Sequence, residues 1–105
     1  MLITTTPTLE NQPIKDYLGI ANGEVIIGIN VIKDFTAGLR DIFGGRSATY
    51  ENELVRGREE AIQEMKSRAK KMGADAVVGV DIDFEVLGQG GSMMMIVATG
   101  TAVKL

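Results

Sequence analysis

One long stretch of the chain, residues 47–72, has the spacing of an amphipathic helix and limits what the rest can fold into. Its apolar residues recur every three or four positions and share one helical face: Leu54, Ala61, Ile62, Met65, Ala69 and Met72. Acidic residues gather in its first half and basic residues in its last part, the order that the helix dipole favours. At roughly 1.5 Å per residue this helix is about 37 Å long, and Gly73 closes it.

The residues before this helix have the patterns of β-strands. Residues 2–6 favour a short edge strand, and residues 14–20 alternate between apolar and polar side chains. The pair Asn22 and Gly23 tolerates the positive φ of a tight hairpin turn. The next run, residues 24–33, is apolar on both alternating faces, which predicts a strand that is covered on two sides.

After the helix the pattern changes to a period of two. Residues 76–86 alternate between apolar and acidic side chains, residues 87–92 predict a turn, and residues 93–103 predict a last strand that is apolar on both faces. Between the first strands and the helix, residues 34–43 predict a short helical turn. The strand at residues 76–86 is expected to carry one apolar and one acidic face: Val78, Val80, Ile82, Phe84 and Val86 opposite Asp81, Asp83 and Glu85.

These elements predict a single α+β domain over residues 1–105, with a small, mostly antiparallel sheet and one long helix. The helix can cover only one face of the sheet, yet at least two strands are apolar on both faces. A large exposed apolar patch is uncommon on a soluble monomer, and the sequence shows no spare element for the second face. Another copy of the chain is the economical cover, so we expect a homo-oligomer, either a dimer or a closed ring.

Composition excludes several kinds of site. The chain has no cysteine and no histidine, which removes thiolate chemistry, Cys-based metal sites, the commonest general base and the commonest transition-metal ligand. The net charge is −3 and the basic residues lie mainly on the helix among acids, so we expect no nucleic-acid or membrane surface. No apolar run approaches the ~20 residues of a membrane span, and the N-terminus lacks a signal-peptide pattern. A cytoplasmic protein is therefore expected.

Three carboxylates on one strand face, Asp81, Asp83 and Glu85, are candidate metal ligands. Neighbouring members of this row are about 6.8 Å apart, and their oxygens suit Mg²⁺, Mn²⁺ or Ca²⁺ better than soft metals. The row lacks the Gly and the later Glu of an EF-hand loop. The alternative interpretation is a solvated strand face.

A second candidate site precedes the N-terminus of the long helix and consists of Gly44, Gly45, Arg46 and Ser47. Backbone amides there, together with Arg46, could hold a phosphate or a carboxylate. The segment is not a P-loop, because the spaced second Gly and the Lys of that motif are missing. An ordinary helix-entry loop, or a contact between subunits, is the alternative.

The methionines at positions 93–95 could offer thioether ligands to copper(I). Consecutive strand residues point to opposite faces, so these side chains could converge only around a symmetric ring. Packing of flexible side chains in a core is the alternative. No nucleophile–base pair is recognisable in the sequence, so we name no catalytic residue.

The chain also carries a series of motifs in a fixed order: FGGRSATYENEL, REEAIQEM, GADAVVGVDIDFEV and a terminal GTAVKL. These motifs resemble the YbjQ-like family of uncharacterised bacterial and archaeal proteins, and TTTPTLENQPIKDYLGIANGEVIIGINVIKD resembles the N-terminal hairpin of that family. The resemblance covers essentially the whole chain. It implies a dodecin-subunit-like α+β domain and a ring-shaped homopentamer built through the sheets. The family is often labelled heavy-metal-binding, and the resemblance implies no catalytic residue.

The sequence therefore predicts a cytoplasmic homo-oligomeric binding or scaffold module whose partner is itself and whose ligand and cofactor are unknown. One alternative is a metal-binding protein that holds a divalent ion on carboxylate oxygens. The other is an enzyme with a site at the subunit interface, where Arg46, Tyr50 and a carboxylate could converge. Stoichiometric divalent ion in the purified protein would favour the first alternative. A pocket between subunits lined by Arg46 and an acid would favour the second.

Overall fold

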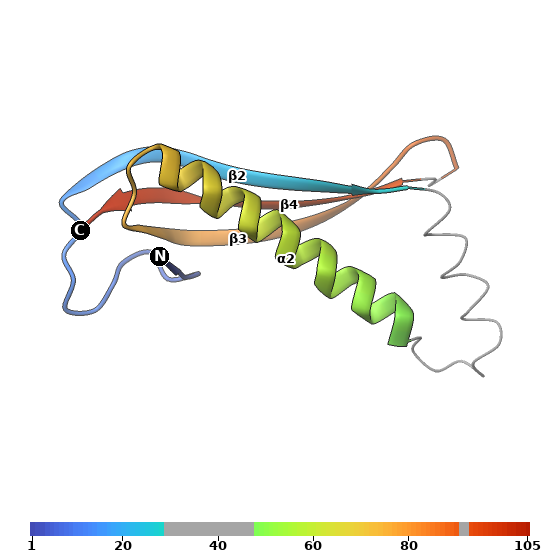
Figure 1. Ribbon diagram of the computed structural model, residues 1–105, viewed down its shortest axis with the longest axis horizontal. Coiled ribbons are helices and arrows are strands. Elements are labelled where there is room, and N and C mark those ends of the chain that lie inside the picture. Colours follow the sequence, from blue (N-terminus) through green and yellow to red (C-terminus); the bar gives the residue numbers. More distant parts are fainter. Residues whose placement is uncertain (29–47, 91–92) are drawn as a thin grey trace.

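The computed structural model describes residues 1–28, 48–90 and 93–105, and these form a sheet with one long helix on it (Figure 1). The elements follow in the order β1 (Leu2–Ile3), β2 (Asp16–Ile27), α2 (Ala48–Lys71), β3 (Ala76–Leu87) and β4 (Met93–Lys104). The sheet has four strands in the order β1-β3-β4-β2. β4 pairs antiparallel with both β2 and β3, and β1 pairs parallel with the outer edge of β3. The α+β class that the sequence predicts is therefore confirmed, with a mixed sheet.

The long helix and the two strands after it lie where the sequence predicts them. The helix, predicted over residues 47–72, spans Ala48–Lys71. Gly73 follows with a φ of 88°, and its amide donates a hydrogen bond to the carbonyl of Lys70 at 3.0 Å. The last two strands each extend one residue beyond the predicted end. The short edge strand near the N-terminus is also present, although it covers only Leu2–Ile3.

The tight turn predicted at Asn22 and Gly23 is wrong, because β2 runs unbroken through both residues. Gly23 allows a close approach instead of a turn. A Cβ atom added there would overlap the carbonyl oxygen of Ala61 and lie 2.5 Å from the amide nitrogen of Met65. The strand can therefore lie directly under the helix backbone only because this position has no side chain.

The helix packs on β2 and β4 through small residues. Gly57, Ala61 and Ala69 are all buried. A Cβ atom added at Gly57 would lie 2.6 Å from Cδ1 of Ile96, which is fully buried below it. A glycine inside a helix costs about 1 kcal/mol relative to alanine, and the packing of Ile96 into the space offsets that cost.

A β-bulge divides β3 and changes which side chains share a face. The register with β4 shifts between Val78 and Asp81, and Gly79 has a φ of 61°. Val77 and Val80 both pack in the main core beneath α2, whereas Val78 packs on the other side of the sheet. The prediction that Val78 and Val80 share one face is therefore wrong, because the extra residue of the bulge shifts the alternation.

The N-terminal segment covers one end of the second face of the sheet. Leu9 and Ile14 pack there in a small second core, whose buried residues are Ala76, Val78 and Val103. The amides of Gly79 and Val80 donate hydrogen bonds to the carbonyls of Thr6 and Thr4, at 2.8 and 3.1 Å. The expectation that no element of the chain reaches the second face is wrong for this end of the sheet.

The rest of the second face carries no further layer within the described part of the chain. We call it the open face, and by strand alternation and register it contains Ile20, Asn22, Glu24 and Ile26 of β2, Asp81, Asp83 and Glu85 of β3, and Met93, Met95, Val97 and Thr99 of β4. Ile26 is 58% exposed, so the two-sided cover predicted for residues 24–33 is absent at this position. Residues 34–43, with the predicted helical turn, lie outside the described residues.

Candidate functional site

The acidic row that the sequence predicts lies on the open face of β3. Asp81, Asp83 and Glu85 are all exposed, and they follow the bulge, which turns them away from the helix. A hydrogen bond with Asp81 and the negative charge of that residue raise the pKa of Asp83, and partial desolvation and the charge of Glu85 add to the effect. Within the described chain, the positive charge near this acidic row is therefore too small to offset its negative charge.

Apolar side chains lie directly beside the acidic row. The strand register places Glu85, Met95 and Ile26 next to one another across β3, β4 and β2. Ile20 is 75% exposed on the same face, and Met95 and Val97 are half-buried. The open face therefore combines an exposed apolar strip with carboxylates, which is the composition of an interaction surface.

Basic residues are almost absent from the strands that form this surface. β2 and β3 contain no Lys or Arg, and β4 contains only Lys104, its last residue. The Nζ atom of Lys104 lies 3.6 Å from Oδ1 of Asp75, at the opposite end of β3 from the acidic row. The carboxylates of the open face thus have no basic partner on their own sheet.

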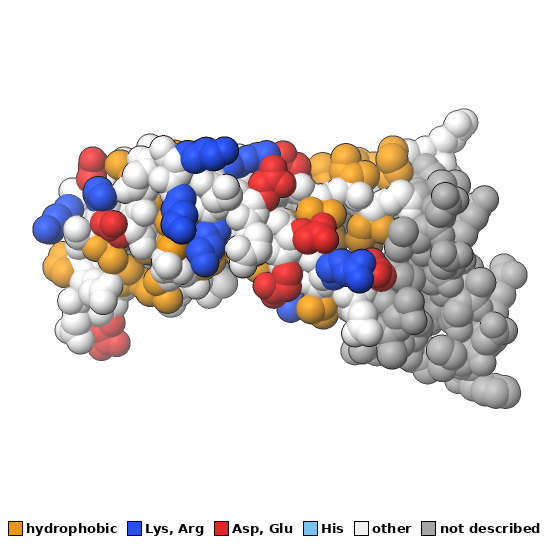
Figure 2. Space-filling view, viewed as in Figure 1, with side chains coloured by type: hydrophobic (Ala, Val, Ile, Leu, Met, Phe, Trp, Pro, Cys, Tyr) orange, Lys and Arg blue, Asp and Glu red, His pale blue; other side chains and the backbone are white. Residues whose placement is uncertain are grey.

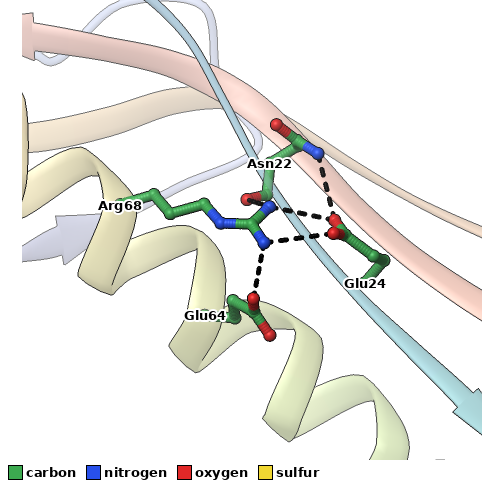
Figure 3. Close-up of polar contacts among 4 residues, drawn as sticks. All are labelled: Asn22, Glu24, Glu64 and Arg68. Carbon is green, nitrogen blue, oxygen red and sulfur yellow. Dashed lines mark hydrogen bonds and ion pairs between the residues drawn. The ribbon is translucent and has the colours of Figure 1, made fainter.

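At the edge of β2, Arg68 of the helix binds the strand through several hydrogen bonds (Figure 3). Its Nη1 donates to Oε2 of Glu24 at 3.0 Å and to the backbone carbonyl of Asn22 at 2.9 Å. Its Nη2 donates to Oε1 of Glu24 at 3.1 Å and also to the carboxylate of Glu64. Two parallel bonds between a guanidinium and a carboxylate are stronger and more directional than a single ion pair. This arrangement fixes the helix against the strand, and we call it the Arg68 bridge.

The Arg68 bridge also sets the ionisation of its members. The hydrogen bond from Arg68 lowers the pKa of Glu24, and the amide of Asn22 adds a further hydrogen bond to the Glu24 carboxylate at 3.0 Å. The same bond raises the pKa of Arg68. Glu24 is therefore neutralised within the chain, unlike the acidic row on β3.

Two grooves lie along α2, and both are open to solvent. The first has a volume of ≈ 230 Å³ and lies between the helix and the end of β2, where Val25, Ile26, Ile27, Gly28, Glu53, Arg56, Gly57 and Glu60 line it. The second has a volume of ≈ 270 Å³ and lies on the outer surface of the helix, where Gln63, Lys66, Ser67 and Lys70 line it. Neither groove encloses a small molecule in the manner of a cofactor pocket.

The described residues contain no cluster of ligands that would support a metal site. Nowhere in residues 1–28, 48–90 and 93–105 do three or more acidic side chains gather closely enough to hold a metal ion. Met94 packs against the main core, whereas its neighbour Met93 is 37% exposed on the other face, so the methionines do not converge within one chain. Binding of a divalent ion by Asp81, Asp83 and Glu85 stays a prediction.

The other sites considered from the sequence fall where the structure gives no description. Gly44, Gly45, Arg46 and Ser47 lie outside the described residues, as does the side chain of Tyr50. The anion site before the helix and the enzyme site at a subunit interface therefore stay predictions.

Sequence reasoning missed the Arg68 bridge. Arg68 and Glu24 are 44 positions apart, and no local pattern connects them. One available signal was the i,i+4 spacing of Glu64 and Arg68, which is typical of an ion pair along a helix. A second signal was Glu24 itself, an acid at the start of an otherwise apolar run.

Comparison with known proteins gives a family and a fold. Residues 1–105 match the YbjQ-like family model, described as "putative heavy-metal-binding". The UPF0145 protein of Acetivibrio thermocellus is 60% identical over 105 residues, which cover 100% of this chain and 99% of that protein. The UPF0145 protein of Clostridium botulinum strain Alaska E43 is 60% identical over 103 residues, 98% and 97% of the two chains.

Among solved structures, the fold is similar to that of a Pediococcus pentosaceus protein of unknown function from the DUF74 family. The TM-score is 0.57 at 20% identity, and the match covers 100% of this chain and 97% of that chain. At this identity the likeness supports the fold alone. In the described part of the chain, no helix is both long and apolar enough to cross a membrane.

Proposed function

The chain belongs to the YbjQ-like family, and from that premise we propose that it is a cytoplasmic homo-oligomeric binding or scaffold module without a catalytic site. In this proposal, copies of the chain cover the open face of one another. The observation that carries it is the exposure of Ile20, at 75%, and Ile26, at 58%, on a sheet face that no described element covers. Ile26 lies next to the half-buried Met95 of β4 on this face, and an exposed apolar patch of this kind marks an interaction site.

The energetic argument depends on the same side chains. Full burial of one isoleucine side chain stabilises by about 1.5–3 kcal/mol, and Met95 and Val97 beside it are already half-buried. The small second core shows that the other end of this face is apolar enough to hold the N-terminal segment. A neighbouring copy would extend that cover along the sheet.

The family resemblance makes the proposal more specific. We extend it to a ring-shaped homopentamer of dodecin-subunit-like domains, because a contact between two different surfaces generates a ring when its rotation closes. The two-layer architecture supports this extension, since the helix leaves one face of the sheet for a neighbour.

The residues present do not fit a heavy-metal site. Soft and borderline metals prefer thiolate and imidazole ligands, and the chain contains no cysteine and no histidine. The carboxylates of the open face form no group of three that could hold a metal among the described residues. The metal in the family description therefore takes no part in the proposed function.

Native mass spectrometry of the untagged protein tests this proposal directly. We expect a homo-oligomer, and we expect Ile26→Glu to shift the population towards monomer because it places a charge in the contact. Val86→Glu is the matched control, since Val86 is 71% exposed but belongs to the helix-facing side of β3. The same spectra report any ligand or ion that the assembly retains.

Two results would overturn the proposal. A wild-type protein that stays monomeric at micromolar concentration would leave the open face without a partner copy. An equal loss of assembly in Ile26→Glu and Val86→Glu would place the contact away from the open face. Far-ultraviolet circular dichroism of both variants checks that a change in oligomer mass is not caused by unfolding.

A further inference from the structure

The charges of the open face restrict which surface can cover it. In a contact of two open faces, the carboxylates of Asp81, Asp83 and Glu85 would enter an interface to which the strands bring no nearby base. Burial of unpaired carboxylates costs several kcal/mol per ion. A two-fold contact of open face with open face is therefore disfavoured, and the covering surface has to supply positive charge.

The helix holds most of the positive charge in the described part of the chain. α2 contains six basic residues, of which three already pair with acids of their own chain: Arg56 with Glu53, Arg58 with Glu59, and Arg68 with Glu24. Lys66 and Lys70 form no ion pair with any described residue, and both line the groove on the outer surface of the helix. Figure 2 shows Lys and Arg side chains gathered over the second half of α2.

The Cα spacing of these two lysines along the helix is similar to the Cα spacing of Asp81 and Asp83 along the strand. Lys66 and Lys70 are one turn apart on the same side of the helix, which separates their Cα atoms by about 6 Å along the axis. Asp81 and Asp83 are alternate residues on one strand face, about 6.8 Å apart. The flexible stems of the lysines accommodate the remaining difference, so the two pairs can meet in one contact.

Resting on the proposed function, we propose that the open face of one copy docks on the outer surface of α2 of the next copy, with Asp81 and Asp83 against Lys66 and Lys70. Each copy then offers two different surfaces, its open face and its outer helix surface. Such a head-to-tail contact continues from copy to copy until it closes as a ring. The raised pKa of Asp83 in the single chain reflects the charge that the neighbour would neutralise.

Charge reversal on each surface, and then on both, tests this contact. One variant carries Asp81→Lys and Asp83→Lys, and a second carries Lys66→Glu and Lys70→Glu. We expect each to raise the protein concentration needed for assembly at least about tenfold, because like charges then meet across the contact. We expect a chain with all four substitutions to assemble again, and we expect the two double variants to associate with each other when they are mixed in equal amounts. Sedimentation velocity and native mass spectrometry measure both outcomes.

Neighbouring lysines provide a matched control. Lys70→Glu and Lys71→Glu change the same charge at adjacent exposed positions, but only Lys70 lines the groove on the outer helix surface. We expect the first to weaken assembly and the second to leave it nearly unchanged.

The failure of this inference differs from the failure of the proposed function. If Ile26→Glu disrupts the oligomer while neither double variant changes it, a neighbouring copy covers the open face through a surface other than the outer side of α2. If both double variants dissociate and the chain with all four substitutions also stays dissociated, the two surfaces do not contact each other. All substituted residues are surface-exposed or half-buried, and circular dichroism confirms the fold of each variant.

Discussion

Gly23 lies where the backbones of α2 and β2 approach each other closely, and the absence of a side chain there allows this packing of the helix on the sheet. An added Cβ atom would meet backbone atoms of Ala61 and Met65, which cannot rotate away as a side chain would. We therefore expect Gly23→Ala to destabilise the fold by about 1–3 kcal/mol, the usual cost of overpacking a core. Urea denaturation measures this as a lower midpoint at an unchanged slope.

The control for this substitution lies at the end of the same strand. No atom of the described residues lies within 4 Å of the position that a Cβ of Gly28 would take, so Gly28→Ala should change the midpoint little. A Gly23→Ala variant as stable as the wild type would show that the helix can move away from β2 without loss. The close packing of these two elements would then contribute nothing to stability.

At the level of elements, the Arg68 bridge ties the second half of α2 to the edge of β2. We expect Arg68→Lys to lower the melting temperature although it keeps the charge, because lysine cannot form the two parallel bonds to Glu24. Arg58→Lys is the control, since among the described residues Arg58 makes only an exposed contact with Glu59, at 4.0 Å.

The pH dependence of this effect follows from Glu24. Its pKa is lowered in the folded chain, so the bridge contributes fully above the ordinary glutamate pKa and is lost as the pH falls through the lowered value. The difference in melting temperature between Arg68→Lys and the wild type should thus shrink on acidification below the ordinary pKa of 4.5. A difference that is constant between pH 7 and pH 3 would contradict the assigned role of Glu24.

The elements that the sequence predicts well are those whose own side chains set their period. α2, β3 and β4 carry long regular patterns, and Gly73 provides a local stop signal. The errors in the predicted strands arise at glycines, because a glycine can allow a turn, a bulge or close packing, and the local sequence does not distinguish among them. Gly23 follows Asn22 as it would in a hairpin turn, yet its role is close packing. Gly79 lies inside an unbroken apolar run, so no signal in the neighbouring sequence indicates the bulge.

The candidate surface was predictable only in part for the same reason. The alternation of Asp81 and Asp83 with apolar residues identifies one acidic strand face. Which side of the sheet that face belongs to depends on the bulge, and its cover depends on Leu9 and Ile14, which are isolated apolar residues in a polar segment. The Arg68 bridge depends on the approach of two elements that are distant in the sequence. Tertiary packing decides all three features.

At the scale of the whole molecule, a folded copy leaves two kinds of unsatisfied surface. The open face carries exposed isoleucines beside carboxylates, and the outer side of α2 carries lysines without partners among the described residues. Each surface has what the other lacks, so a second copy can satisfy both at once. Within the described residues of one copy the two surfaces cannot meet, because they lie on opposite sides of the two-layer structure.

Acidification distinguishes this head-to-tail assembly from a contact in which carboxylates meet carboxylates. If Lys66 and Lys70 face the acidic row, association lowers the pKa of Asp83 below its value in the free chain, where that pKa is raised by Asp81. Association is then strongest above the free-chain pKa and weakens as the pH falls through the lowered value. If carboxylates face one another, protonation relieves repulsion and association strengthens instead. Light scattering from pH 7 to pH 3 at constant ionic strength gives the sign, and Asp81→Asn with Asp83→Asn should flatten the dependence.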